Sequence, residues 1–214
     1  LTTSRREIPE ATTWVDVDAT ALLDARAAMN ATLPGAERVG LLALLARLTV
    51  AALRRFPQLN ASVDVDRRQI VQHGRVHLGI AAQTPRGLVV PVIADADTLT
   101  TVELARRLAE TTALARDGAL PPARLTGGTF TLNNYGVFGV DGSAPIINHP
   151  EAAILGIGRI IDKPRVVNGE LAVRKVTTLS IAFDHRVCDG GSAGGFLRFV
   201  ADAVEQPVRL LAEW

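Results

Sequence analysis

The sequence contains few of the residue types that build disulfides and metal sites. Its 214 residues include one cysteine, Cys188, and four histidines. A single cysteine excludes an internal disulfide and agrees with a reducing compartment, so we expect a cytoplasmic protein. Zinc needs several clustered cysteine, histidine or carboxylate ligands, and His185 with Cys188 and Asp189 offers too few of them. We expect no metal site.

Long hydrophobic runs and an excess of charge of either sign are also missing. Uninterrupted apolar runs such as Gly40 to Ala46 are far shorter than the roughly 20 residues that cross a bilayer. Lys and Arg number 23 and Asp and Glu 22, so the net charge is +1. Such a balance creates no field that recruits nucleic acid or an anionic membrane. We expect neither as a partner.

No nucleophile of a serine hydrolase is recognisable either. The letters Gly-x-Ser-x-Gly occur once, at 190–194, but Ser192 begins the predicted helix over 192–205 and does not follow directly on a strand, so it is not a nucleophile elbow. None of the other four serines lies in a recognisable nucleophile context. Cys188 is a conceivable nucleophile beside His185. It lies between Val187 and Asp189, however, and free cysteine is among the most buried residue types, so we expect a packed, inert thiol.

The most informative segment that is present surrounds His185. Residues 177–183 have the β-branched and aromatic composition of a buried strand, and apolar residues at helical spacing predict a helix over 192–205. His185 therefore lies in a strand-to-helix connection, where packing can fix the ring and leave it facing a cavity. Because the unperturbed pKa of histidine lies near neutrality, the ring can accept and return a proton. The alternative is a buried histidine whose nitrogens are bonded to backbone.

The remaining pattern predicts one domain over 1–214, since no linker or charge run divides it. Helices are predicted over 19–30, capped by Asp18, over 39–56, and from the capping box of Thr100 and Glu103 to Asp117. Strands are predicted over 14–18, 59–65, 68–72, 76–83, 88–94, 128–134 and 152–161. We expect a turn at 84–87, a meander at the sheet edge, and a type I′ hairpin in which Asn168-Gly169 joins strands over 165–167 and 171–173. This mixture predicts an α/β two-layer sandwich with a mixed sheet.

Residues 184–190, Asp-His-Arg-Val-Cys-Asp-Gly, resemble the D-H-R-x-x-D-G signature of the catalytic domain of dihydrolipoamide acyltransferases. These are the E2 core components of 2-oxo acid dehydrogenase complexes, and they share a fold and a catalytic histidine with chloramphenicol acetyltransferase. Further segments resemble the family in the same order: 56–62, 77–81, 87–92, 127–132, 147–151 and 156–158. The resemblance covers nearly the whole chain, and it implies a chloramphenicol acetyltransferase-like fold.

The resemblance also implies a mechanism of direct transfer between two thiols. In the family, the histidine deprotonates the thiol of coenzyme A, which attacks the acyl thioester on dihydrolipoamide, and the same base serves the reverse reaction. Here that histidine is His185. A Ser or Thr hydroxyl donates to the oxyanion in the family, and its position is occupied here by Asn133, whose amide can also donate. Asn134 is a neighbouring candidate, and the alternative is that both asparagines cap a strand end.

The second position of the signature is Asp189, which is Asp or Asn in the family. We expect it to hold the loop, with an arginine as a conceivable partner, and not to carry a proton. Asp184 and Arg186 are expected to form fixed ion pairs, with solvated charges as the alternative. Gly139 and Gly142 lie in a loop that in the family is near the substrate channel.

Assembly and partners follow from the resemblance alone. The family site lies between subunits of a trimer, with the histidine from one subunit and the oxyanion donor from its neighbour, and the trimers build a cage. Residues 1–9 correspond to the end of a helix and the following loop, so we expect a fragment whose lipoyl and subunit-binding domains lie upstream. The E1 and E3 components are expected to bind through those domains. The run 210–214 is a candidate contact between trimers.

The acyl group is the least determined feature. The segment from Asn134 to Gly139 resembles the bacterial branched-chain type, with acetyl as the alternative and succinyl also open. A stand-alone coenzyme A-dependent acetyltransferase of the chloramphenicol acetyltransferase type is a rival interpretation. A non-catalytic structural core subunit is another, although the presence of both His185 and Asp189 argues against it.

Overall fold

The structure is a computed structural model, and it describes residues 1–84 and 87–212. The centre of the turn predicted at 84–87 and the side chains of the run 210–214 lie outside the described residues. Within the described ranges, no helix combines the length and the apolarity that crossing a bilayer requires.

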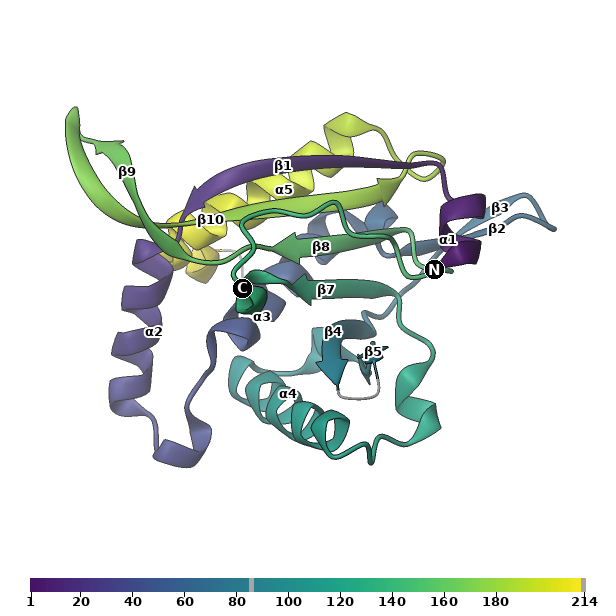
Figure 1. The fold of residues 1–214 in the computed structure, drawn as a ribbon, viewed down its shortest axis with the longest axis horizontal. Coiled ribbons are helices and arrows are strands. Elements are labelled where there is room, and N and C mark those ends of the chain that lie inside the picture. The colour runs from purple at the N-terminus through teal and green to yellow at the C-terminus, as the bar shows by residue number, and fades with distance from the viewer. Residues whose placement is uncertain (85–86, 213–214) are drawn as a thin grey trace.

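Most strands form one mixed sheet of eight (Figure 1). Its order is β1-β10-β8-β7-β4-β5, with β6 paired to β4 and β9 paired to β10. The strands β4, β7 and β8 are parallel, and the other pairings are antiparallel. The strand bounds are β1 Glu10–Asp18, β4 Leu78–Thr84, β5 Gly87–Val89, β6 Val92–Ile93, β7 Phe130–Asn134, β8 Ala153–Ile157, β9 Ile161–Val167 and β10 Glu170–Asp184.

The long helices pack against one face of this sheet, which gives the two-layer α/β sandwich that the sequence predicts. Figure 1 shows α3 and α5 behind the strands. Phe196 of α5 and Phe130 of β7 are fully buried with ring centroids 5.6 Å apart, and they join Leu179 and Ile181 of β10 in one apolar cluster. The helix bounds are α1 Thr2–Glu7, α2 Thr20–Thr32, α3 Leu41–Arg55, α4 Thr101–Arg116 and α5 Gly190–Glu205. Short 3-10 segments are Gly35–Glu37, Pro57–Leu59, Ala96–Thr98, Pro122–Leu125, Gly136–Phe138 and Pro207–Ala212.

The opposite face of the sheet has a smaller cover. Ile8, after α1, and Ile147, in the connection from β7 to β8, pack there against Ile154 and Ala182. Figure 1 shows that connection crossing the front of the sheet. Alternation along β7 and β10 directs every second side chain to this face, so the residues between the core positions face the connection and not the helices.

Predictions of helix caps and tight turns, which depend on residues close in sequence, are confirmed. Thr100 and Glu103 form the predicted capping box, and Asn168 and Gly169 have the positive φ angles, 53° and 85°, of a type I′ turn. Asp18 accepts from the amide of Thr20 at 2.9 Å, although the residue before α2 is Ala19.

Pairing between distant segments corrects three predictions. The predicted edge meander is wrong in part, because β2 Ala61–Asp64 and β3 Gln69–Gln72 form a separate two-stranded sheet, while β4 lies inside the large one. The strand predicted over 152–161 ends at Ile157. The strands predicted over 171–173 and 177–183 are one strand of 15 residues, β10, because β1 and β9 pair with successive parts of it.

Candidate active site

His185 follows directly on β10, in a loop that is fixed on two sides. The N–H of Asp184 donates to the carbonyl of Ala152 at 2.8 Å, and the N–H of His185 donates to the carbonyl of Pro9 at 3.0 Å. The ring itself is exposed, and its centroid lies 5.7 Å from that of Phe183. The backbone is therefore held while the imidazole stays accessible to a ligand.

Asp184 and Arg186 anchor this loop with an ion pair whose carboxylate is buried. The Asp184 side chain is 2% exposed. Its carboxylate accepts from the Arg186 guanidinium at 2.6 Å and 3.0 Å and from the Arg186 backbone N–H at 2.9 Å. These bonds raise the pKa of the guanidinium. A buried carboxylate needs such partners, and the predicted ion pairing of both residues is confirmed.

Asp189 and Cys188 lie in the same loop and have no visible part in proton transfer. Asp189 is the N-cap of α5, where its Oδ1 accepts from the Ser192 N–H at 3.1 Å. It forms no ion pair with any arginine that the structure describes, so its local role is to begin the helix. Burial, with help from nearby carboxylates, raises the pKa of the Cys188 thiol to about 11. The thiol stays protonated at neutral pH, as expected for an inert cysteine.

The two candidate oxyanion donors differ in their hydrogen bonding. Phe130 and Leu132 of β7 face the helices, so Asn133 faces the opposite side of the sheet. The Asn134 side chain accepts from the Gly136 N–H at 3.1 Å and so caps the turn after the strand. The half-buried side-chain amide of Asn133 makes no hydrogen bond within the described part of the chain. Only Oδ1 of Asn134 is engaged, so the two asparagines differ in the face of β7 on which they lie and not in free N–H donors.

A polar pair beside Asn133 has no counterpart in the sequence predictions. Asn133 is in register with Gly156, and Gly156 with Ser180, across β7, β8 and β10. The Tyr135 and Ser180 hydroxyls are hydrogen-bonded at 2.9 Å. The pair lies over Gly156, and a side chain at that position would collide with it, because a Cβ on Gly156 would lie 2.6 Å from Ser180 Oγ. Ser180 also lines a cavity of about 430 Å³, together with Trp14, Thr178 and residues 141–144. The one available signal is that Tyr135 is the only tyrosine of the chain.

Glu151 is a second residue that the sequence pattern does not reveal. Its side chain is buried, and the carboxyl accepts from Thr131 Oγ1 at 2.6 Å and from the Asn148 amide at 3.0 Å. Burial raises its pKa to about 7, against the lowering effect of both hydrogen bonds. An isolated glutamate in a sequence gives no sign of such burial.

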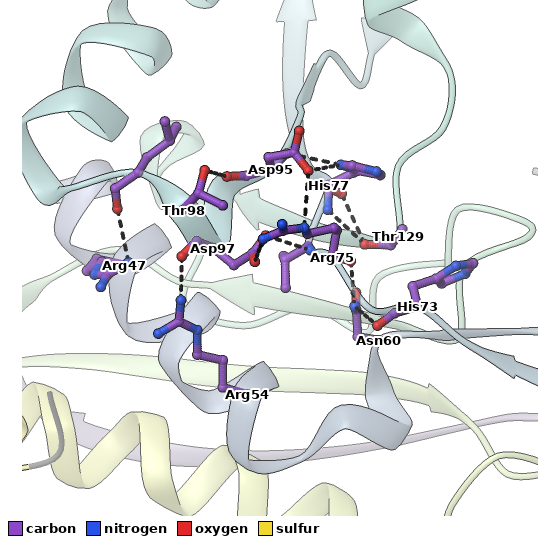
Figure 2. Close-up of polar contacts among 12 residues, drawn as sticks. Arg47, Arg54, Asn60, His73, Arg75, His77, Asp95, Asp97, Thr98 and Thr129 are labelled. Atoms are coloured by element: carbon purple, nitrogen blue, oxygen red, sulfur yellow. Dashed lines mark hydrogen bonds and ion pairs between the residues drawn. The ribbon is translucent and has the colours of Figure 1, made fainter.

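The other histidines do not join His185. Figure 2 shows His77 and His73 in a polar cluster between the start of β4 and the 3-10 segment Ala96–Thr98. His77 Nδ1 accepts from the Asp95 N–H at 3.0 Å, and the His73 carbonyl accepts from Asn60. His149 lies 3.4 Å from Glu7. No group of three or more potential metal ligands occurs among residues 1–84 and 87–212.

Strand register separates His185 from Asn133 within one chain. Asn133 is aligned through Gly156 with Ser180, and His185 lies five residues beyond Ser180. Five residues of strand span roughly 16 Å, and two strand spacings add about 10 Å across the sheet. In Figure 1, β10 runs toward α1 while β8 points the other way. The structure therefore does not bring the predicted base and the predicted donor together in a single copy.

Solved structures share this architecture. Two chains align with a TM-score of 0.91 and 31% identity, covering 99% of this chain and 87% of each. One is the dihydrolipoamide acetyltransferase of Azotobacter vinelandii, in whose catalytic mechanism the roles of a serine, a histidine and an asparagine have been investigated. The other is the cubic core of a pyruvate dehydrogenase multienzyme complex. A chloramphenicol acetyltransferase aligns with a TM-score of 0.53 and 16% identity, over 95% of this chain and 92% of its own, which shows the shared fold.

Sequence relatives agree. The lipoamide acyltransferase component of the branched-chain alpha-keto acid dehydrogenase complex of Pseudomonas aeruginosa is 41% identical over 98% of this chain and 49% of its own length. The succinyltransferase component of the 2-oxoglutarate dehydrogenase complex of Escherichia coli is 42% identical over 82% of this chain and 43% of its own length. The chain thus spans about half the length of the curated relatives it matches. The family model for the 2-oxoacid dehydrogenases acyltransferase (catalytic domain) matches residues 1–212. The chain therefore belongs to the family of 2-oxoacid dehydrogenase acyltransferase catalytic domains.

Proposed function

We propose that this chain transfers an acyl group between a dihydrolipoyl-lysine arm and coenzyme A, with His185 as the general base. The observation that carries the proposal is an exposed imidazole on a loop whose backbone and ion pair are fixed. Free thiols have pKa values near 8.5, so only a small fraction is thiolate at neutral pH. A positioned base removes that limitation: His185 takes the thiol proton, and the thiolate of coenzyme A attacks the thioester carbonyl directly. The tetrahedral oxyanion then collapses, the carbon–sulfur bond to dihydrolipoamide breaks, and the leaving thiolate takes the proton back from His185.

Spacing along the chain supports the site assignment. In the Azotobacter protein the serine precedes the histidine by 52 positions and the asparagine follows it by four. Asn133 precedes His185 by 52 positions and Asp189 follows it by four. We propose Asn133 as the donor to the tetrahedral oxyanion, through its amide N–H. Asp189 acts on the loop, by capping α5.

A second copy of the chain completes the site in this proposal. Strand register holds His185 and Asn133 apart in one copy. In a closed ring, the His185 end of one copy can lie beside the Asn133 end of the next, so that two copies form each site. A trimer is the ring that we propose, assembling further into a cage, and the cubic core of the pyruvate dehydrogenase neighbour supports it.

The substrates and partners of the whole protein belong to the same proposal. Coenzyme A is a substrate, and the lipoyl group is carried on a separate domain that we expect upstream of residue 1, together with a subunit-binding domain for E1 and E3. A branched-chain acyl group is our first choice, because the Pseudomonas relative acts in a branched-chain complex and matches 98% of this chain. Acetyl and succinyl are the alternatives, and relatives in pyruvate and 2-oxoglutarate complexes represent them.

The test is thioester exchange with the purified chain. Isobutyryl, isovaleryl, acetyl and succinyl coenzyme A are each supplied with dihydrolipoamide, and acyl-dihydrolipoamide is measured. We expect transfer, fastest with a branched acyl group, and loss of transfer in His185→Ala. His73→Ala is the matched control, because the His73 side chain lies in the separate cluster of Figure 2. Absence of transfer from every donor would reject the proposal in favour of a structural core subunit.

A further inference from the structure

The Glu151 carboxyl occupies a site built for it between β7 and the segment that enters β8. The side chain is 2% exposed, with Thr131 Oγ1 at 2.6 Å and the Asn148 amide at 3.0 Å. Gly128 leaves room for it, since a Cβ there would lie 2.8 Å from Glu151 Oε1. Gly79 leaves room for its partner, since a Cβ there would lie 2.9 Å from Thr131 Oγ1. Larger residues at either glycine would displace this hydrogen-bonded pair.

The site contains no charge to balance an ionised Glu151. Its pKa of about 7 results from burial opposed by hydrogen bonds from Thr131 and Asn148, and no charged group among the described residues contributes. The titratable groups on neighbouring segments are His149 on the same connection, His77 before β4, Asp64 on β2 and Asp184 at the end of β10. His149 faces Glu7, and Asp184 is paired with Arg186. The neutral carboxyl is therefore the form that this site stabilises below neutral pH.

Glu151 is linked to both parts of the proposed chemistry. Thr131 lies two residues before Asn133 on β7, so both side chains are on the same face of the strand. Ala152, the next residue after Glu151, accepts from the N–H of Asp184, and His185 follows. A shift of the Glu151 carboxyl would thus be transmitted to the donor strand through Thr131 and to the His185 loop through Ala152.

We propose that Glu151 is a positioning residue for acyl transfer, whose neutral carboxyl holds the strand that carries Asn133 and the loop that carries His185 in their reactive arrangement. This inference rests on the proposed function. Glu151 touches neither substrate nor reacting atoms in this account. Its ionisation would leave a buried charge without a cation, and the surrounding segments would have to admit water or move apart.

A pH dependence follows from the requirement for a neutral Glu151. Because the carboxyl must be protonated, turnover falls as pH rises through about 7. Glu151 is therefore responsible for an alkaline fall in the wild-type kcat.

Glu151→Gln tests this directly, because glutamine has the shape of the neutral acid and cannot ionise. We expect kcat on the acid side to stay within about threefold of wild type and the alkaline fall to disappear. Glu170→Gln, on the exposed β9–β10 hairpin, removes the same charge elsewhere and should keep the wild-type profile. A Glu151→Gln profile that coincides with that of wild type would overturn the inference.

Thr131→Val provides a second measurement with little change in volume. Removing its hydroxyl takes one hydrogen bond from Glu151, and we expect kcat to fall about tenfold with the KM for coenzyme A unchanged. A folded variant with wild-type kcat would contradict the positioning role. These outcomes are distinguishable from failure of the proposed function. Absence of acyl transfer by the wild-type chain would reject the function itself, and a fully active His185→Ala would reject His185 as its base, whereas the Glu151 and Thr131 variants test only the positioning role of Glu151.

Discussion

The two ends of the large sheet hold their candidate functional residues in different ways. At the His185 end, a buried carboxylate, Asp184, is paired with Arg186, and the imidazole beside them is exposed. At the Asn133 end, polar side chains are joined by neutral hydrogen bonds, as between Tyr135 and Ser180 at 2.9 Å. One end therefore anchors its loop with an ion pair on a buried carboxylate. The other joins Tyr135 to Ser180 by a neutral hydrogen bond, and its ion pair, Arg159 with Asp141, has side chains that are 43% and 49% exposed.

The difference matches what each end has to do. A general base exchanges protons with substrate and needs access to it, while its loop needs a fixed anchor, as the pair of Asp184 with Arg186 provides. An oxyanion donor needs a fixed dipole in a site from which water is excluded. Glu151 combines a feature of each end. It is as buried as Asp184, at 2% exposure, but its hydrogen-bond partners are neutral, like those of Tyr135 and Ser180. It is accordingly the group whose charge changes near pH 7.

The largest effect is expected at the His185 end. His185→Ala should lower turnover by roughly 10²–10⁴, the usual contribution of a general base, because the two carboxylates of the same loop are engaged, Asp184 by Arg186 and Asp189 by the Ser192 N–H. The fold should be unaffected, since the backbone of His185 and not its ring makes the bond to Pro9. Steady-state turnover with circular dichroism checks both points, and a folded variant with a near-normal rate at neutral pH would remove His185 from the mechanism.

At the Asn133 end, Asn133→Ala should reduce transition-state stabilisation by roughly 2.7–4 kcal/mol, as at other oxyanion donors, with little change in coenzyme A affinity. Asn133→Ser should recover much of that loss. Asn134→Ala is the matched control, because Asn134 caps the turn after β7 and lies on the other face of the strand. Measurement of kcat and KM for the three variants shows which asparagine is the oxyanion donor. If Asn133→Ala has wild-type kcat and Asn134→Ala is inactive, the donor is Asn134.

The anchor of the His185 loop can be tested through stability. Arg186→Met leaves the Asp184 carboxylate buried without its cation, and we expect the free energy of unfolding to fall by about 3 kcal/mol. Arg198→Met breaks a surface pair with Asp202, in which both side chains are 46% exposed, and should cost at most about 1 kcal/mol. Urea titrations at one protein concentration measure both values. Equal losses would mean that the Asp184 pair is no more than a surface pair.

The last effect concerns the pH dependence of stability and is about as large as the Arg186→Met loss. The folded-state pKa of Glu151 is about 7, above its ordinary value of 4.5, so the folded state binds the proton more tightly. The resulting stability is fully present below pH 4.5 and is lost as pH rises through about 7, in total about 3 kcal/mol. The unfolding free energy of Glu151→Gln should lack this decline. Parallel curves for wild type and variant would contradict the assignment.

Sequence reasoning succeeded where a signal was local or belonged to a family block. The strand and helix around His185 follow from side-chain periodicity, and the capping box of Thr100 and Glu103 from two residues three positions apart. The fold class followed from the mixture of elements and from the resemblance. These features depend on neighbours in sequence, so no knowledge of pairing is required.

The remaining features depend on which distant segments meet. Tyr135 and Ser180 are 45 positions apart, and only the register of β7, β8 and β10 brings them together. The burial of Glu151 depends on Gly128 and Thr131 of another segment. The separate β2–β3 sheet was not predicted for the same reason. Alternation of side chains along the sequence predicts that a segment is a strand but not which other strand it pairs with.

The most direct test of the account asks whether the two ends of the sheet act in different copies. His185→Ala and Asn133→Ala chains, each nearly inactive alone, are refolded together in equal amounts and assayed for acyl transfer. In a ring where each site takes His185 from one copy and Asn133 from the next, random mixing restores both residues to one site in four, so we predict about a quarter of wild-type activity. Mixed assemblies no more active than either variant alone, with subunit exchange verified, would contradict the shared site.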